Sequence, residues 1–389
     1  MKILFTASQE TCLKNIIEIQ KLNIEKNLVF ESTFINQSNV FTFSNYDLAE
    51  IKGLKFKVKN LTLPLNIKKI SDRKLGIVKR YLIYISNYKL IDNLIKNHDV
   101  FIFSPGGFLE HKIAYKAKKY GKKTIFIEGG LQFGKVKINK INFLGMAIAK
   151  LIKRIFNLNL FKFLIINDHY QELDYLITTG SFSKTVWSDL GVPEEKIYDI
   201  GVPRYKNLFQ YHTNQNQDKN IVYATGAYIF HNDSNGEIQD LNNIKELYEI
   251  IRKEDLTDKF YVLVHPRDSD DGEKIFYLKS KNINIIESND KVLKKNCLLL
   301  TRNSTMVYEY LISNRPGYYY KPDSSRETIP HLDFRINQIE HLSKIIKLFI
   351  SNKIIQNKEL AYEIISETTE RSSEIIIEKC VYGNNKKAN

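Results

Sequence analysis

The feature that most constrains the fold is a repeated order of apolar run, turn, helical pattern and apolar run. Residues 99–107 (DVFIFSPGG) and 122–130 (KKTIFIEGG) are near-continuous apolar runs that end in glycine pairs, and a helical pattern over 110–120 separates them. Runs without polar alternation are typical of strands buried on both faces. Strand, turn, helix and strand in this order predict a doubly wound parallel sheet.

The same order restarts in the second half of the chain. Segments over 220–228, 260–268 and 297–304, each of which contains an apolar run followed by polar or small residues, alternate with helical patterns over 242–254 and 305–314. A chain of 389 residues has the length of two ordinary domains. We therefore expect an α/β protein of two Rossmann-like domains that face a central cleft. The expected parts are an N-terminal acceptor-binding domain over 1–209, a linker over 210–220, a C-terminal nucleotide-donor domain over 221–345 and a helical tail over 346–389.

Composition narrows the class of protein. The net charge of +14 predicts an anionic partner, which could be nucleic acid, a phosphorylated ligand or a lipid surface. The three cysteines are far apart, which predicts neither a disulfide framework nor a zinc site and indicates a reducing compartment. The opening apolar run is too short for a secretory signal, and no stretch long enough to span a bilayer is free of charge.

A basic stretch over residues 135–164 carries much of the excess charge. Seven basic residues and no acidic residue lie between Glu128 and Asp168, and large apolar residues recur near helical spacing among them. This pattern predicts an amphipathic helix that binds an anionic membrane surface. A domain helix whose lysines face solvent is the alternative. No nucleic-acid-binding module is present, so nucleic acid is not an expected partner.

Glycine pairs end two strands of the predicted N-terminal domain. In parallel sheets ligands bind at the carboxyl ends of strands, and Gly106, Gly107, Gly129 and Gly130 would leave room there for a ligand against the backbone. Glu128 could act as a general base that accepts a proton from an attacking hydroxyl. A surface glutamate in a glycine turn is the alternative.

Two strand ends of the C-terminal domain carry candidate phosphate ligands. His265, Pro266 and Arg267 follow the run 260–264 and offer two cationic or donor groups at one strand end. A hydrogen-bonded structural histidine is the alternative. Arg302, Ser304 and Thr305 lie between the next such run and a helix, where hydroxyl and backbone N–H groups favour an anion, or where they make an ordinary helix cap.

Three further features complete this set. Glu309 lies about one turn inside the helix that follows Thr305, from where it could reach a ribose diol or simply be solvated. The segment 201–204 (GVPR) is interpreted as the hinge side of the cleft. The acidic residues of 268–271 read as a solvated loop, so neither a metal nor another cofactor is expected.

A carboxylate in one domain and phosphate ligands in the other suit transfer from a nucleotide-activated donor to a hydroxyl acceptor. No serine-hydrolase elbow, Walker loop or dinucleotide fingerprint is present.

The ordered motifs resemble bacterial GT-B glycosyltransferases of capsule and lipooligosaccharide synthesis, and among them the sialyltransferases and polysialyltransferases. Those families carry an acidic-acidic-Gly motif with the general base, then a His-Pro motif, then a Ser-Ser or Ser-Thr motif that contacts the CMP phosphate. Glu128-Gly129-Gly130, His265-Pro266 and Ser304-Thr305 match in order. Gly129 occupies the second acidic position, so the base assignment rests on Glu128 alone.

This resemblance implies inverting transfer of a CMP-activated sialic or other nonulosonic acid to a glycan acceptor, either free or lipid-linked. Glu128 would deprotonate the acceptor, and His265, Arg267 and the Ser304 helix start would stabilise the departing phosphate. The protein would be cytoplasmic and peripheral on the inner face of the bacterial cytoplasmic membrane.

Four alternatives remain open. Residues 100–330 also resemble the CDP-glycerol glycerophosphotransferases, through the segments 178–209, 265–268 and 302–323. A UDP- or GDP-sugar transferase and a nucleotide-sugar epimerase would share the fold. A basic two-domain protein that binds a polyanion or lipid is the non-enzyme alternative.

Overall fold

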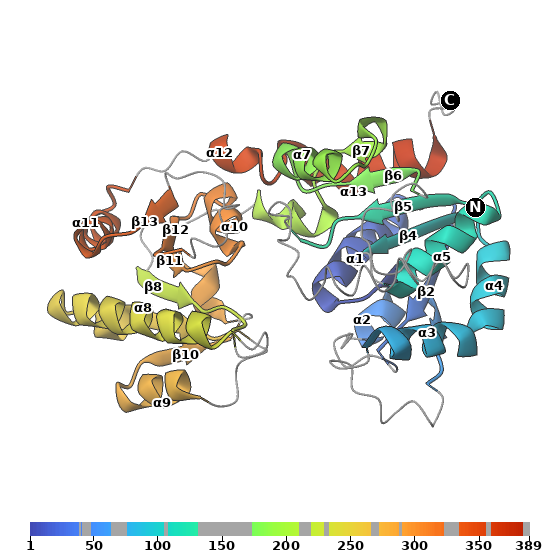
Figure 1. The fold of residues 1–389 in the computed structure, drawn as a ribbon. Helices are drawn as coiled ribbons and strands as arrows, with labels where there is room; N and C mark the ends of the chain where they lie inside the picture. Colours follow the sequence, from blue (N-terminus) through green and yellow to red (C-terminus); the bar gives the residue numbers. More distant parts are fainter. Residues whose placement is uncertain are drawn as a thin grey trace. The chain divides into compact units, whose positions relative to one another are not determined.

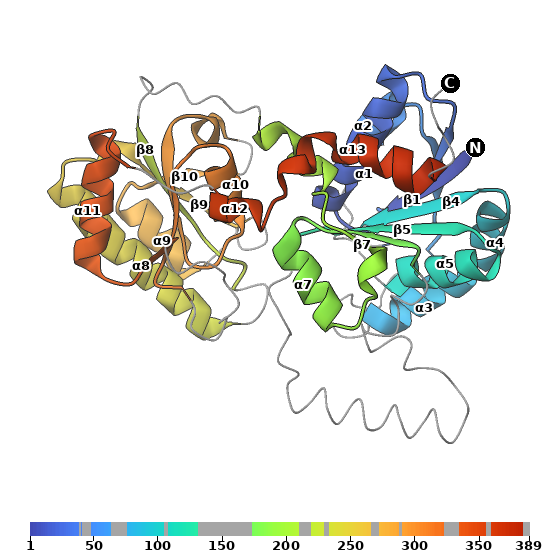
Figure 2. The ribbon, with the colours of Figure 1, turned by 90° about the horizontal axis from the view of Figure 1, so that it is seen from above.

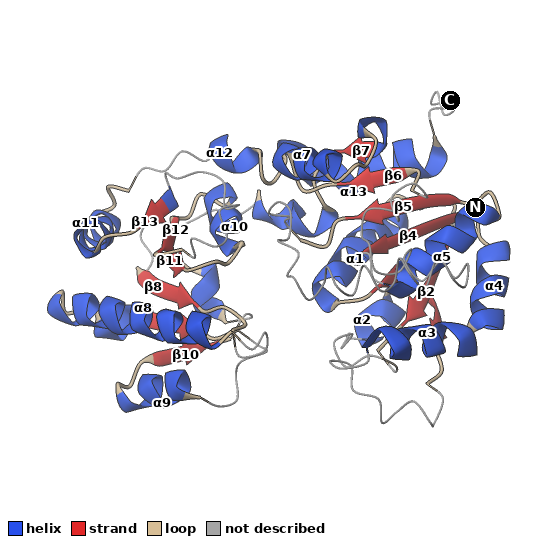
Figure 3. Ribbon diagram, viewed as in Figure 1, coloured by secondary structure: helices blue, strands red, loops and turns tan. Residues whose placement is uncertain are grey.

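The chain divides into two compact units. The computed structural model describes residues 1–38, 40, 48–63, 76–104, 108–130, 173–209, 219–228, 233–265, 272–287, 290–322, 334–354 and 359–383. Unit 1 comprises residues 1–206 and 366–389, and unit 2 comprises residues 207–365 (Figure 1). In both units the described strands form one sheet flanked by helices (Figure 3).

Unit 1 contains a seven-stranded sheet in which all pairings are parallel, in the order β3-β2-β1-β4-β5-β6-β7. Its central strands are apolar and buried along almost their whole length, as expected of a sheet covered on both faces. The strands are β1 (Lys2–Ala7), β2 (Glu31–Asn36), β3 (Lys57–Asn60), β4 (Val100–Ser104), β5 (Lys123–Ile127), β6 (Tyr175–Ile177) and β7 (Ile197–Tyr198).

Helices cover both faces of this sheet. Figure 2 shows α1, α2 and α13 on one face and α3, α5 and α7 on the other. One apolar core joins alternate residues of the strands, such as Leu4, Phe101 and Phe103, to the inner sides of α3, α4 and α5. The helices are α1 (Glu10–Glu25), α2 (Leu48–Gly53), α3 (Gly76–Ser86), α4 (Tyr88–Lys96), α5 (Phe108–Lys119), α7 (Ser181–Asp189) and α13 (Ser372–Ile375), the last continued by a π-helical segment, Ile376–Tyr382.

Unit 2 contains a six-stranded parallel sheet in the order β10-β9-β8-β11-β12-β13. Its middle strands β8 and β11 are buried at every position. The strands are β8 (Asn220–Ala224), β9 (Phe260–Leu263), β10 (Asn284–Ile286), β11 (Cys297–Thr301), β12 (Gly317–Tyr320) and β13 (Arg335–Ile336). The two doubly wound parallel sheets confirm the predicted α/β class and the pair of Rossmann-like domains.

The helices of unit 2 also lie on both faces. The apolar core on one face contains residues of α8, α9 and α11, whereas α10 packs against β11 and β12 through Val307 and Tyr310. The helices are α8 (Ser234–Lys253), α9 (Glu273–Ser280), α10 (Met306–Ile312), α11 (Ile339–Ile350) and α12 (Glu359–Tyr362).

The C-terminal residues belong to two units, whereas we predicted that they form one separate part of the chain. We expected one helical tail over 346–389, but residues up to Ile365 belong to unit 2 and those from Ser366 onward to unit 1. The reason lies in burial: the apolar side of α11 enters the unit 2 core, whereas α13 packs on α1. The linker predicted at 210–220 and the central cleft stay predictions.

The described residues contain no helix that is both long and apolar enough to cross a membrane.

The return of the chain to unit 1 depends on a close contact at Gly201. Its φ of 78° lies in the left-handed region, and a Cβ there would stand 1.9 Å from Oγ1 of Thr369, which is fully buried. The Thr368 hydroxyl donates to the Ile200 carbonyl at 3.0 Å, and the Ser366 N–H donates to the Thr179 carbonyl at 2.8 Å. The segment that begins at Ser366 is therefore docked closely on unit 1.

We predict that Gly201→Ala lowers the unfolding free energy of unit 1 by about 2–4 kcal/mol, because it adds overpacking to backbone strain. The matched control is Gly121→Ala, since Gly121 also has a positive φ, of 67°, but open space around its Cβ position. It should cost about 1 kcal/mol. Thermal unfolding followed by the fluorescence of Trp187, the only tryptophan in the chain, reports on unit 1. Equal losses in the two variants would contradict close docking of the C-terminal segment.

Candidate functional site

The order of strands in unit 2 marks one place for a ligand. From β8 the chain winds through β9 to β10 on one side of the sheet, and then continues with β11, β12 and β13 on the other side. The edge of the sheet at the carboxyl ends of β8 and β11 is therefore a topological switch point, the place where ligands of doubly wound sheets bind. The loops that leave these ends begin at Thr225 and Arg302, and His265 follows the neighbouring strand β9.

Hydrogen bonds connect the three strand ends at this point. The His265 N–H donates to the Thr225 hydroxyl at 2.9 Å, and the Thr301 hydroxyl donates to the Ala224 carbonyl at 2.7 Å. The same Thr301 oxygen accepts a hydrogen bond from the Ser304 N–H at 3.2 Å. His265 and Ser304 are only half-buried. The structure thus brings two of the predicted phosphate ligands to one edge of one sheet.

Ser304 and Thr305 form the entry to α10. The Ser304 hydroxyl accepts a hydrogen bond from the Met306 N–H at 3.3 Å, whereas the Thr305 side chain makes no capping hydrogen bond. Both residues are half-buried, and so is Glu309 in the first turn of the helix. The Ser304 hydroxyl therefore caps the start of the helix, which is the alternative role named above. Because Ser304 is partly exposed, a contact with a phosphate stays a prediction.

The side chain of Arg302 points toward helix α8, whereas a phosphate ligand was expected to point out of the strand end. Its side chain is 4% exposed and its guanidinium donates to the Gly236 carbonyl at 3.5 Å and to the Gln239 amide oxygen, both on α8. The guanidinium also lies over the ring of Tyr228, 5.6 Å from its centre. In this arrangement Arg302 fixes α8 to the end of β11, and its predicted contact with phosphate stays a prediction.

Tyr228 is a positioning residue that the sequence did not single out. The Asn303 amide donates to its hydroxyl at 2.9 Å, which ties the loop after β8 to the loop after β11. A Cβ on Gly226 or Gly236 would stand 2.5 Å or 2.3 Å from the Tyr228 ring, so both glycines are required by this packing. The signal in the sequence was the stretch 225–228 (TGAY) directly after an apolar run.

In unit 1, Glu128 lies in the interior. It is fully buried, and its carboxylate accepts hydrogen bonds from the Thr179 N–H at 2.8 Å, the Ser183 hydroxyl at 2.5 Å and the Trp187 indole N–H at 3.0 Å. Ser183 and Trp187 belong to α7, and Thr179 lies two residues before this helix begins, just after β6. The carboxylate thus joins β5 to α7.

Burial raises the pKa of Glu128 above its ordinary value of 4.5, and the hydrogen bonds from Ser183, Thr179 and Trp187 oppose that rise. A raised pKa suits a general base, but a fully buried carboxylate with three donors is not presented to a substrate in this conformation. Its role as the base stays a prediction. The half-buried backbone of Gly129 and Gly130 follows it at the edge of the sheet.

Several predicted residues lie outside the part of the chain that the structure describes. They are Gly106, Gly107, Pro266, Arg267 and the basic stretch 135–164.

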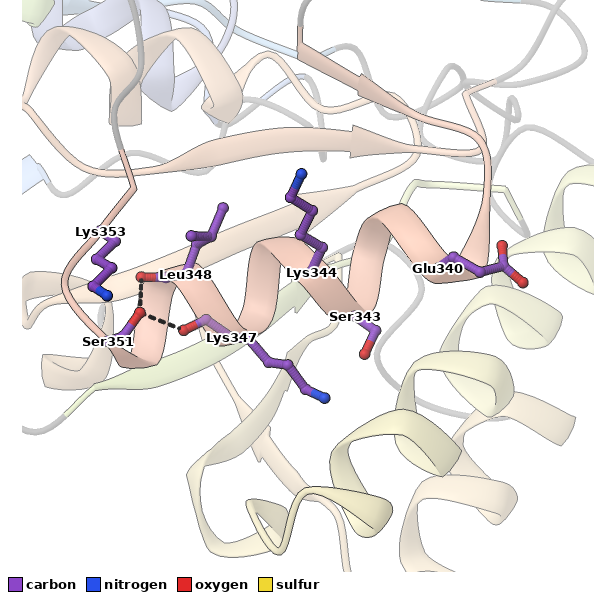
Figure 4. A pocket seen from close by; sticks show the side chains of 7 residues that line it. All are labelled: Glu340, Ser343, Lys344, Lys347, Leu348, Ser351 and Lys353. Atoms are coloured by element: carbon purple, nitrogen blue, oxygen red, sulfur yellow. Dashed lines mark hydrogen bonds between the residues drawn. The ribbon is translucent and has the colours of Figure 1, made fainter.

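A shallow depression on unit 2 lies along helix α11, apart from the candidate residues. Figure 4 shows the side chains that line it, among them Glu340, Lys344 and Lys347 on the helix and Lys353 after its end. Lys347 also pairs with Glu254 at 3.0 Å. Among the described residues, no three His, Cys, Asp or Glu side chains come together as a set of metal ligands.

Comparison with known proteins shows likeness in structure only. No protein-family model matches the sequence, and no curated protein matches it. A UDP-GlcNAc 2-epimerase of Methanocaldococcus jannaschii is similar with a TM-score of 0.61 at 14% identity, over 98% of this chain and 100% of that one. A UDP-GlcNAc 2-epimerase of Neisseria meningitidis bound to UDP-GlcNAc gives a TM-score of 0.62 at 11% identity, over 98% of this chain and 100% of that one.

A transferase is similar as well. The glycotransferase of kitacinnamycin gives a TM-score of 0.55 at 12% identity, over 97% of this chain and 98% of that one. These likenesses extend over both units and confirm the predicted GT-B fold. They do not bear out the narrower resemblance to sialyltransferases or CDP-glycerol glycerophosphotransferases, which stays a prediction.

The raised pKa of Glu128 predicts how the stability of unit 1 depends on pH. A carboxyl whose folded pKa lies above its unfolded value of 4.5 favours folding most below that pH, and the contribution is lost as the pH rises through the folded pKa. The unfolding free energy of unit 1, followed by Trp187 fluorescence, should therefore contain a component that falls above about pH 4.5. Glu128→Gln should remove this component.

The control for this measurement is Asp189→Asn, which changes an exposed carboxyl on α7 and should leave the pH dependence unchanged. An identical pH profile in wild type and Glu128→Gln would show that the carboxyl is not held in the interior as described.

Proposed function

We propose that the protein is an enzyme of nucleotide-activated sugars and that the loops at the carboxyl ends of β8, β9 and β11 bind the nucleotide of the donor. The observation that carries this proposal is the gathering of His265, Ser304 and Thr305 at the switch point of a parallel sheet. Phosphate oxygens accept hydrogen bonds from hydroxyl groups, backbone N–H groups and imidazoles, and all three kinds of donor are present at this edge.

The chemistry of such a site is stabilisation of a leaving phosphate. When the bond between sugar and phosphate breaks, negative charge develops on the phosphate oxygens, and fixed donors aimed at them lower the barrier. The imidazole of His265 can supply one such hydrogen-bond donor. The backbone N–H of His265 is held by Thr225 and that of Ser304 by Thr301, so each residue has a fixed backbone position at its strand end.

Two reactions fit this donor site. The motif order favours transfer of the sugar to a glycan hydroxyl, with a CMP-linked sialic or nonulosonic acid as donor. The whole-chain likeness to UDP-GlcNAc 2-epimerases favours a UDP-linked donor and an epimerase that needs no acceptor. The interior position of Glu128 gives the transfer mechanism no support, because that mechanism needs its carboxylate at the acceptor.

The first experiment is thermal stabilisation of the full chain by CMP, CDP, UDP and GDP at equal concentration. A nucleotide present at about 100 times its dissociation constant adds about 2.7 kcal/mol to the folded state. If CMP gives the largest shift, a CMP-linked nonulosonate donor is supported. If CDP does, a CDP-glycerol donor is supported, and if UDP does, a UDP-sugar donor is supported. No shift with any of the four would contradict a nucleotide site.

A second assay separates transfer from epimerisation. The nucleotide sugar whose nucleotide gives the largest shift is incubated with the enzyme in the absence of an acceptor, and the sugar is analysed by NMR. A new epimer identifies an epimerase. A donor that is unchanged until a glycan acceptor is added identifies a transferase.

We predict that His265→Ala and Ser304→Ala each weaken binding of the preferred nucleotide by roughly 10-fold or more, because each removes a hydrogen bond to a charged group. The matched controls are His341→Ala and Ser343→Ala, which lie on α11 in the same unit. Calorimetric titration measures all four. Unchanged affinity in both site variants would place the nucleotide elsewhere.

We also propose that the basic stretch 135–164 holds the protein on an anionic membrane, where the acceptor would be lipid-linked. The support is its charge, since each basic residue near such a surface contributes about 1 kcal/mol. Sedimentation with vesicles should show binding that requires anionic lipid and falls with salt.

Replacing Lys150, Lys153 and Arg154 by Gln should reduce vesicle binding by at least 10-fold, as expected from about 1 kcal/mol for each charge. The control replaces Lys344, Lys347 and Lys353, which removes the same charge from unit 2. Equal losses in the two triple variants would show that only net charge matters.

A further inference from the structure

Unit 1 has a switch point of its own. From β1 the chain winds to β2 and β3 on one side and then to β4 through β7 on the other, so the reversal lies between β1 and β4. The two strand ends are joined there, because the Ser8 N–H donates to the Ser104 carbonyl at 3.2 Å. A ligand of unit 1 is expected outside these carboxyl ends and those of the neighbouring strand β5.

Asn15 holds the segments around this point together. It is fully buried on α1, and its amide donates to the Ser104 hydroxyl at 3.2 Å and to the Glu128 carbonyl at 3.3 Å. Its side-chain oxygen accepts a hydrogen bond from the Arg204 N–H at 3.0 Å. One side chain thus fixes the ends of β4 and β5 and the start of the 3₁₀ helix Pro203–Leu208 relative to one another.

This 3₁₀ helix brings a half-buried arginine to the end of β5. The guanidinium of Arg204 lies 4.3 Å from the centre of the Tyr205 ring, and a Cβ on Gly130 would stand 3.9 Å from its Nη2 atom. Pro203 and Tyr205 on either side are buried and anchor the turn. The Nη2 atom of Arg204 donates a hydrogen bond to the Tyr205 hydroxyl, which holds the guanidinium beside Gly130.

The charge of Arg204 acts on the neighbouring thiol of Cys12. Burial raises the pKa of the Cys12 thiol, whose sulfur lies 3.8 Å from the Gly129 carbonyl oxygen, and the charge of Arg204 opposes that rise. The opposite effect of Glu110 on the same thiol is smaller. The carboxylate of Glu128 points away from this place and accepts hydrogen bonds from Thr179 and from Ser183 and Trp187 of α7.

We propose that Arg204, together with the half-buried backbone of Gly129 and Gly130, is an anion-binding site of unit 1 that takes the phosphate or carboxylate group of a substrate. A guanidinium presents parallel N–H donors that match either group. The glycines let an anion approach the backbone closely. The identity of the anion as part of a sugar substrate rests on the proposed function, whereas the existence of the site does not.

Trp187 gives a direct way to test this site. It is the only tryptophan, lies in unit 1 and donates its indole N–H to Glu128, which directly precedes Gly129. Sodium phosphate and sodium acetate are titrated separately into the full chain at constant ionic strength, with chloride as the balancing ion. We expect a saturable change in Trp187 fluorescence with at least one of them. Phosphate alone identifies a phosphate group, and acetate as well identifies a site that also accepts carboxylates.

Arg204→Gln should weaken this response by at least about 10-fold. Arg371→Gln removes the same charge from an exposed position in unit 1, where Arg371 pairs with Glu374, and should leave the response unchanged. Gly130→Ala is the second site variant, since its methyl group would meet Arg204 only at ordinary contact distance and leave the fold intact. It should also weaken the response, because it fills the space beside the guanidinium.

The test is independent of the nucleotide site in unit 2. Ser304→Ala should leave the Trp187 response to anions unchanged even if it abolishes nucleotide binding. A saturable response that Arg204→Gln and Gly130→Ala do not alter would overturn the proposal, and so would the absence of a saturable response to either anion.

Discussion

The parallel pairing of β8 with β11 is the constraint on which the rest of unit 2 depends. Five residues of β11 are in register with β8, and both strands are buried throughout. Because the chain reverses its winding between them, their carboxyl ends form a topological switch point, where ligands of doubly wound sheets bind. Thr301 and Thr225 then fix the positions of Ser304 and His265 at that edge through backbone N–H groups. The strand order thus determines where the proposed nucleotide site lies, and the side chains then supply its hydrogen-bond donors.

In unit 1 the corresponding edge is held by buried polar groups. The Asn15 side chain donates to the ends of β4 and β5 and accepts from the start of the 3₁₀ helix Pro203–Leu208. The Glu128 carboxylate accepts three hydrogen bonds from the end of β6 and from α7. Buried polar groups of this kind are costly unless their hydrogen bonds are made, so they specify one arrangement of the loops. The two residues are therefore best understood as the framework of the edge, on which Arg204 and the glycines are displayed.

The sequence predicted the parallel sheets well because their strands are continuous apolar runs that end at glycine or polar turns, as in 122–130 and 297–304. It placed His265 and Ser304 at strand ends for the same reason. The direction of a side chain could not be predicted: Glu128 and Arg302 both follow buried strands, yet both point toward helices, because α7 and α8 offer partners in the interior. Nor could the roles of Asn15 and Tyr228, whose partners lie far away in the sequence. The return of the C-terminal segment to unit 1 depends on a contact between Gly201 and Thr369 that no local pattern reveals.

The most direct test of the central claim is a crystal structure of the full chain with the nucleotide that stabilises it most. We predict phosphate density at the carboxyl ends of β8 and β11, within hydrogen-bonding distance of Ser304 or Thr305 and beside His265. Nucleotide density in unit 1 or in the depression along α11, with the β8–β11 edge empty, would contradict it.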